Sequence, residues 1–358
     1  MTQPCAGQIP VVVLAGFLGS GKTTLLNHLL HRSGGTRIGA VVNDFGSIEI
    51  DAMAVAGQLG DSTVSLGNGC LCCAVDVSEL DAYLERLARP SARIDVIVIE
   101  ASGLAEPQEL VKMVLASENP HVVYGGLVEV VDAVEFDATR QRHPEVDRHL
   151  GIADLVVVNK TDRVPEEERE RVLALVRGLT DRAAVVPASY GRVDVELLLD
   201  RKPVGERTGQ LSFDDLHDHE EKEEKEEEGG GHHDHLHSAY ESLSFSSEVP
   251  MAPRPFMALL DSRPAGLYRI KGYVDFGAAD PRNKYAVHAV GRFLRFYPEP
   301  WAPGEPRLTQ LVLIGSGVDV PGLEKELEAS RAYAPHADAD EHSMWGVLRY
   351  VQEPEPAE

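Results

Sequence analysis

Nearly continuous apolar segments alternate with helical patterns through the first part of the chain. The segments are rich in β-branched residues and lie at 11–14, 40–42, 94–99, 127–131, 155–158 and 183–186. Strands that are apolar on both faces belong inside a parallel sheet that helices cover. Candidate helices stand between these strands, at Lys22–His31, Asp76–Ala88, Pro107–Ala116 and Pro165–Gly178. The alternation predicts an α/β fold with a mostly parallel, doubly wound sheet over residues 1–205.

The pattern changes after residue 205. Asp214–His237 holds eleven acidic residues, two lysines, six histidines and three consecutive glycines, with almost no apolar residue. Because such a segment cannot bury a core, we expect a disordered linker over 206–237. Beyond it, strand-like runs at 267–276, 285–290, 293–297 and 309–314 precede a helical pattern at 322–329. These runs predict a small α+β domain over 238–358.

The net charge of the chain limits the kinds of partner that it is expected to bind. The 358 residues include 34 Lys and Arg against 58 Asp and Glu, a net charge of -24. This balance argues against a basic surface for nucleic acid or anionic membrane, and it suits a cation as partner. No stretch approaches the roughly 18 uninterrupted apolar residues of a membrane span. We therefore expect a cytoplasmic protein that binds neither nucleic acid nor membrane.

A phosphate-binding motif follows the first strand. Residues 16–23 read Gly-Phe-Leu-Gly-Ser-Gly-Lys-Thr and fit G-x-x-x-x-G-K-[ST] between a predicted strand and a predicted helix. In such a P-loop, backbone N–H groups close around phosphates, Lys22 reaches the β- and γ-phosphates and the Thr23 hydroxyl ligates Mg²⁺. The candidate residues are Gly16, Gly19, Ser20, Gly21, Lys22 and Thr23. The plain alternative is a glycine-rich turn without a ligand.

The base-reading motif lies at the end of the strand at 155–158. Asn159-Lys160-Thr161-Asp162 fits N-K-x-D, in which the Asp accepts hydrogen bonds from guanine N1–H and the 2-amino group while Asn159 and Lys160 frame the base. Adenine cannot offer those donors, so the motif selects GTP over ATP. Taken alone, the four residues could also be a surface turn.

Acidic residues follow two other strands. Glu100 ends the strand at 94–99, where an acid often supports Mg²⁺, and Gly103 stands where a backbone N–H can sense the γ-phosphate. Asp44 follows the second strand and is a candidate for Mg²⁺ or for ordering the attacking water. A solvated loop acid is the alternative for Asp44. Lys22, Asp44 and Glu100 are the candidate catalytic residues.

Three of the four cysteines, Cys70, Cys72 and Cys73, form a C-x-C-C run. Three thiolates can bind one Zn²⁺ and leave its fourth position open, which allows the metal to be passed on. A buried structural cluster and a thiol redox centre are the alternatives. The linker histidines either gather divalent metal weakly or only solubilise a tether.

The order of these motifs resembles the CobW family of metallochaperone GTPases over nearly the whole chain. Its most specific element is G-C-x-C-C at 69–73. The resemblance implies that Cys70, Cys72 and Cys73 are metal ligands, that the phosphate site spans Gly19 to Thr24, and that GTP drives metal binding while hydrolysis drives release. Thiolates take both zinc and cobalt, and zinc is favoured at equal geometry.

The sequence thus favours a GTPase that uses GTP and Mg²⁺ and delivers Zn²⁺ to a client apo-metalloprotein. One rival function is a Co²⁺ chaperone for cobalamin biosynthesis. A second is a metal-storage protein in which the His-rich tract acts and GTP is incidental. A translation or signalling GTPase would leave the cysteines unexplained and would lack a basic surface for RNA.

Overall fold

The apolar runs of the first part of the chain form one parallel sheet in the computed structural model, which describes residues 8–33, 36–42, 63–65, 77–103, 105–199, 240–332 and 342–351. Within these residues the sheet has seven strands in the order β3-β2-β4-β1-β5-β6-β7, and every pairing is parallel. The strands are β1 Ile9–Gly16, β2 Ile38–Val42, β3 Thr63–Ser65, β4 Val96–Glu100, β5 Val122–Asp132, β6 Leu155–Asn159 and β7 Ala184–Pro187. The parallel sheet is confirmed.

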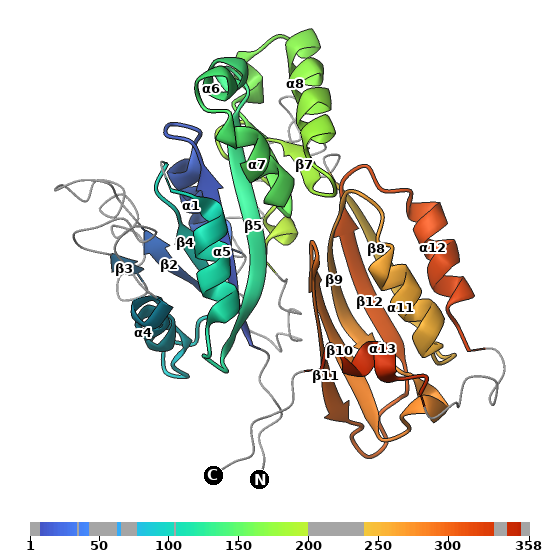
Figure 1. Cartoon of the computed structure of the whole chain (residues 1–358). Helices are drawn as coiled ribbons and strands as arrows, with labels where there is room; N and C mark the ends of the chain where they lie inside the picture. Colours follow the sequence, from blue (N-terminus) through green and yellow to red (C-terminus); the bar gives the residue numbers. More distant parts are fainter. Residues whose placement is uncertain are drawn as a thin grey trace, which may run out of the picture.

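Helices cover both faces of this sheet (Figure 1). They are α1 Lys22–His31, α4 Val77–Ala88, α5 Pro107–Ala116, α6 Phe136–Arg142, α7 Glu145–Ile152 and α8 Glu166–Leu179. Leu25, Leu26 and Leu29 of α1 pack on one face with Val12 and Leu14. Side chains of α4 and α5 pack on the opposite face, as do those of α7 and α8 farther along it. The doubly wound α/β fold therefore follows from strands that are apolar on both sides.

Local sequence explains where the predicted helices begin. Pro107 occupies the first turn of α5, where its missing N–H costs no helical hydrogen bond. Pro165 is the N-cap of α8, and glutamates 166–168 fill the first turn, where the helix dipole favours negative charge. The sequence pattern missed β3, which has three residues, and the short helices α6 and α7.

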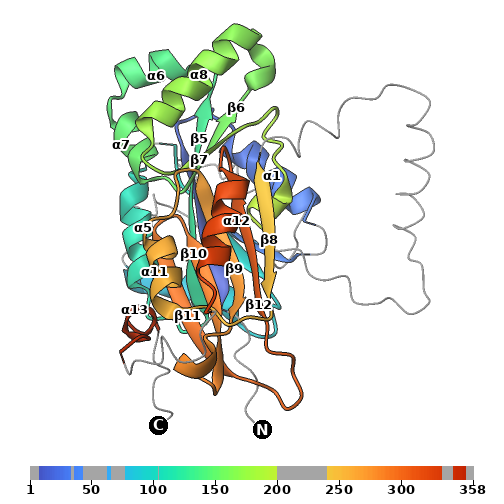
Figure 2. The same cartoon turned by 90° about the vertical axis from the view of Figure 1, so that its right-hand side faces the viewer.

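The last part of the chain forms a five-stranded antiparallel sheet in the order β11-β10-β9-β12-β8. Its strands are β8 Glu241–Ser247, β9 Leu267–Val274, β10 Asn283–Val290, β11 Phe293–Pro300 and β12 Thr309–Gly315. The helices α11 Pro253–Asp261 and α12 Val320–Ala329 lie on one face of this sheet (Figure 2), with the short α13 Trp345–Leu348 near α11. This α+β unit agrees with the expected class, although β8, α11 and α13 were not anticipated.

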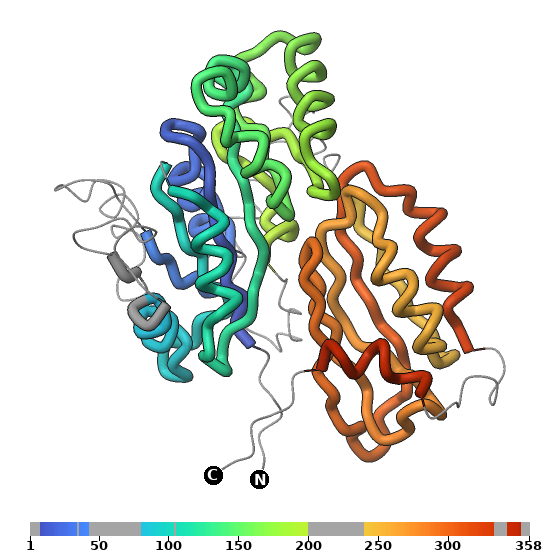
Figure 3. Tube along the Cα trace, viewed as in Figure 1, coloured from blue at the N-terminus to red at the C-terminus, as the bar shows by residue number. Residues whose placement is uncertain are grey.

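The two sheets are built from successive stretches of chain and pack side by side (Figure 3). Tyr268 and Val290 of the second sheet belong to the same hydrophobic cluster as Val12 and Leu14 of β1. Polar contacts reinforce the packing: the His288 ring hydrogen-bonds the Tyr124 carbonyl oxygen at 2.9 Å. The antiparallel sheet thus packs against the first half of β5.

Asp154 anchors this junction from the loop before β6. Its carboxylate accepts hydrogen bonds from the Tyr124 hydroxyl at 2.6 Å and from the Leu127 N–H at 2.9 Å. Burial raises the pKa of Asp154, and these hydrogen bonds oppose that rise.

Among the described residues, no helix is long and apolar enough to cross a membrane.

Candidate functional site

The P-loop joins β1 to α1 and wraps the amino end of that helix. Gly21, the N-cap of α1, has a left-handed backbone with φ 106°, and a Cβ there would lie 2.2 Å from Asn159 Nδ2. Only glycine satisfies both the dihedral angle and the close approach. The Ser20 N–H donates to the Phe17 carbonyl oxygen at 3.1 Å, which closes the loop. A glycine-lined loop at a helix amino end is suited to phosphate.

Lys22 lies inside this loop. Its side chain is buried, and its Nζ donates to the carbonyl oxygens of Gly16 at 2.8 Å and Phe17 at 3.2 Å. Ser20 is also buried within the loop, whereas Thr24 is exposed on the first turn of α1. The ammonium group is therefore held at the point where the motif requires a positive charge for phosphates.

Thr23 and Glu100 meet although 77 residues separate them. The Thr23 hydroxyl donates to Glu100 Oε1 at 2.7 Å, and Glu100 is buried at the end of β4. The register of β1 and β4, which pairs Leu14 with Glu100, brings them together. A hydroxyl and a carboxylate oxygen at one point are ligands that Mg²⁺ prefers. This geometry fits the predicted magnesium site.

The loop after β4 touches the P-loop directly. A Cβ on Gly103 would lie 2.7 Å from the backbone nitrogen of Leu18, so only glycine allows this approach. Gly103 therefore lies beside the phosphate loop, as expected for a residue whose backbone N–H is to sense a γ-phosphate.

Asn159 ties the N-K-x-D segment to two other loops. Its Nδ2 donates to the Ser20 carbonyl oxygen at 2.9 Å, and its Oδ1 accepts from the Gly191 N–H at 2.9 Å. Lys160 has a left-handed backbone, and its Nζ is 2.6 Å from Asp132 Oδ2. Asp162 is exposed at the same edge of the sheet. The structure thus brings the two motifs together into one candidate nucleotide site.

A cavity of about 290 Å³ adjoins this site. It is lined by Phe17 and Leu18 of the P-loop, by Asp132 and Lys160, and by side chains of α6 and α7. The P-loop and the base-reading segment therefore share one concave surface, which is typical of ligand sites at the carboxyl edge of a parallel sheet.

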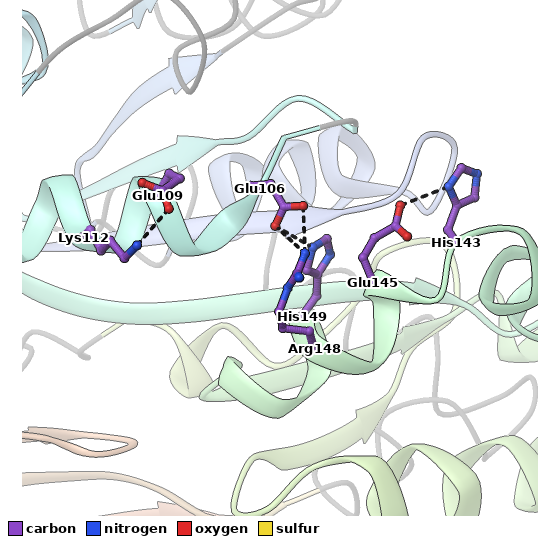
Figure 4. A network of polar contacts seen from close by, with 7 residues as sticks. All are labelled: Glu106, Glu109, Lys112, His143, Glu145, Arg148 and His149. Carbon is purple, nitrogen blue, oxygen red and sulfur yellow. Dashed lines mark hydrogen bonds and ion pairs between the residues drawn. The ribbon is translucent and has the colours of Figure 1, made fainter.

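A polar network behind the P-loop was not anticipated from sequence (Figure 4). Arg148 and His149 of α7 bind Glu106, the N-cap of α5, at 2.9 and 3.3 Å. The Phe17 ring lies 4.8 Å from the His143 ring and 6.1 Å from the His149 ring. Burial lowers the pKa of His149, against the effect of Glu106. The network connects the P-loop to the segment that follows Glu100.

Asp132 and Glu129 of β5 were missed for different reasons. Asp132 directly follows the apolar run at 127–131, so the reasoning that identified Glu100 would also have found it. Glu129 sits within that run and is 1% exposed, and nothing in the local pattern marks a buried acid. Glu129 lies near Lys22 of the P-loop. Asp132 forms an ion pair with Lys160 of the base-reading segment.

Other candidate residues lie outside the described part of the chain. These are Asp44, the cysteines Cys70, Cys72 and Cys73, and the His-rich segment 214–237. Within the described ranges, no group of three or more His, Cys, Asp or Glu side chains is arranged to hold a metal ion. The metal site therefore stays a prediction from sequence.

Known proteins resemble the chain over most of its length. The model of the CobW/HypB/UreG nucleotide-binding domain matches residues 10–187, and that of the cobalamin synthesis protein cobW C-terminal domain matches residues 240–331. The zinc chaperone CobW of Sinorhizobium sp is 32% identical over 86% of this chain and 93% of its own length. The zinc chaperone CobW of Pseudomonas aeruginosa is 31% identical over 91% and 92%, respectively.

Among solved structures, the Zn(II)-bound YjiA GTPase from E. coli is 22% identical, with a TM-score of 0.43, over 91% of this chain and all of that one. The two domain matches cover both sheets in order, and the sequence relatives extend across both. The chain therefore belongs to the CobW/HypB/UreG family of nucleotide-binding proteins, in the CobW form that carries the additional C-terminal domain.

Proposed function

We propose that this protein is a GTP-dependent zinc metallochaperone. It binds Zn²⁺ through Cys70, Cys72 and Cys73 and transfers the ion to a client apo-metalloprotein, and GTP hydrolysis drives the release. The observation that carries the proposal is the joining of the P-loop and the N-K-x-D segment by Asn159, which bonds to the Ser20 carbonyl oxygen and to the Gly191 N–H. The names of the two long relatives, both zinc chaperones, support zinc as the cargo.

We assign guanine selectivity to Asp162 and the binding of the phosphates to the P-loop. Mg²⁺, when bound, is held by the hydroxyl of Thr23 and supported by Glu100, whose Oε1 already lies 2.7 Å from that hydroxyl. Lys22 neutralises the developing charge on the phosphates. Asp44 is the proposed residue for ordering the attacking water.

The topology gives a reason for coupling between nucleotide and metal. β3 runs parallel to β2 and ends at Ser65, so the chain leaves it at the same edge of the sheet as Glu100 leaves β4. Cys70 follows five residues later in the sequence. A loop ordered by GTP and Mg²⁺ at this edge would bring three thiolates together and lower the entropy cost of binding zinc.

Competitive Zn²⁺ titration in the presence of GTP, GDP or no nucleotide tests the proposal. GTP should tighten zinc binding by about 5- to 150-fold, and zinc should tighten GTP binding by the same factor. Cys72→Ser should abolish this gain and leave metal-free GTP binding intact, whereas Cys5→Ser, outside the cluster, is the matched control. Equal zinc affinity with GTP and GDP would contradict the proposal. Parallel titration with Co²⁺ separates the cobalt rival.

A further inference from the structure

Tyr190, in the loop after β7, combines exposure with an unfavourable backbone. Its φ is 56°, and 68% of the residue is exposed. Only three residues other than glycine have a positive φ in the described part of the chain: Arg93, Lys160 and Tyr190. A bulky side chain in the left-handed region is strained, and such strain persists where the surrounding structure imposes it, often at binding sites.

Hydrogen bonds on both sides hold Tyr190 beside the base-reading segment. The Thr161 N–H donates to the Ala188 carbonyl oxygen at 3.1 Å, and the Thr161 hydroxyl donates to the same oxygen at 2.9 Å. On the other side, the Gly191 N–H donates to Asn159 Oδ1 at 2.9 Å. The strained tyrosine is therefore fixed against the loop that contains Lys160, itself left-handed at φ 61°.

A guanine base presents one polar edge and two apolar faces, and its binding requires a contact for each. Asp162 is the group proposed for the edge. The Lys160 side chain, held by its ion pair with Asp132, is suited to one face. The second face needs a flat, exposed apolar group on a neighbouring loop. Among the exposed aromatic side chains of the described residues, Tyr190 is the one whose loop bonds to the N-K-x-D segment.

We propose that Tyr190 stacks on the guanine base of the bound nucleotide, on the face opposite the Lys160 side chain. The proposal rests on the guanine-nucleotide binding proposed above. The guanidinium of Arg192, in the same loop, lies 6.0 Å from the centre of the Tyr190 ring. The ring thus acts as a wall of the base site, and stacking contributes affinity without reading the base edge.

GDP affinity of the full chain, measured by calorimetry, tests the stacking. Tyr190→Ala should weaken GDP about 5- to 100-fold, the range for loss of one base–aromatic stack. Tyr190→Phe keeps the ring and should bind GDP within about twofold of wild type. IDP, which lacks the 2-amino group that Asp162 reads, should lose affinity by the same factor in Tyr190→Ala. GDP binding to Tyr190→Ala within twofold of wild type would overturn the proposal.

Tyr190→Trp gives a direct spectroscopic signal. GDP should quench the fluorescence of the new indole relative to wild type, and pyrophosphate, which occupies only the P-loop, should not. Equal quenching by both would indicate a loop movement and would refute stacking. A wild-type protein that fails to bind GDP would instead reject the proposed function itself, so the two failures are distinguishable.

Tyr190→Gly separates binding from stability. Glycine adopts φ 56° without strain, so this variant should melt at the same temperature as wild type or higher, yet bind GDP as weakly as Tyr190→Ala. If Tyr190→Gly instead lost stability together with affinity, the tyrosine would be a structural residue, and the stacking proposal would fail. If Tyr190→Ala kept GDP affinity but lost zinc delivery to a client, the ring would belong to a protein-docking surface.

Discussion

Glu129 makes the stability of this protein depend on pH in a direction opposite to that of most carboxylates. It lies in β5, paired with Ala15 of β1 and Val156 of β6, and it is 1% exposed. Its Oε2 accepts no hydrogen bond from any described residue. Burial raises the pKa of Glu129 from 4.5 to about 8, although the Lys22 ammonium acts to lower it. Folded protein at neutral pH therefore holds this carboxyl in its neutral form.

The raised pKa sets both the sign and the size of the effect. Below pH 4.5 the Glu129 carboxyl is protonated in both the folded and the unfolded chain. Its titration therefore does not change the free energy of unfolding there. As pH rises toward 8, the unfolded chain ionises while the folded chain does not. The free energy of unfolding then falls by about 1.4 kcal/mol per pH unit, or about 5 kcal/mol in all.

Glu129→Gln removes the ionisation and keeps the shape. Urea unfolding of wild type and variant, without nucleotide, should be compared from pH 5 to pH 9. The free energy of unfolding of wild type should fall by about 4 kcal/mol relative to the variant across this range. Glu324→Gln changes an exposed glutamate of α12 and is the matched control, expected to parallel wild type. A difference between wild type and Glu129→Gln that stays constant from pH 5 to 9 would refute the reasoning.

Two further predictions concern the domain junction and the base site. A Cβ on Gly291, where φ is 52°, would lie 1.6 Å from Asp154 Oδ1. Gly291→Ala should therefore displace this carboxylate and lower the free energy of unfolding in urea by about 2 to 4 kcal/mol. Gly304→Ala is the control for backbone strain alone, because Gly304 has φ 80° and a Cβ there would meet nothing within 4 Å. It should lower the free energy of unfolding by less than Gly291→Ala does. Asp162→Asn should weaken GTP about 10- to 100-fold and improve binding of xanthosine triphosphate. Wild-type protein that binds ATP as tightly as GTP would disprove the assignment of Asp162.

The parts that sequence predicted well are those where a local pattern determines the structure. Pro107–Ala116 was bounded correctly because proline marks its first turn and apolar residues recur at helical spacing. The helices α6 and α7 were missed because each has eight residues or fewer and Pro144 separates them. Short polar helices of this kind depend on tertiary packing more than on pattern.

The candidate site likewise contains residues that a local pattern predicted and residues that it did not. Lys22 and Asn159 were found because their motifs are contiguous in the sequence. The contact between Glu106 and His149 was not, since it joins residues 43 positions apart whose types carry no motif. Glu129 was included within an apolar run, and its burial follows from the pairing of β5 with both neighbours, which only the fold reveals.

Tyr268 and Val290 share one hydrophobic cluster with Val12 and Leu14, so buried apolar side chains hold the second domain against the first. Separating the two domains would expose Tyr268 and Val290 to water, at a cost of about 1.5 to 3 kcal/mol for each. This cost favours a fixed arrangement of the two sheets. A structural change at the candidate nucleotide site is therefore expected to leave the packing between the two sheets in place.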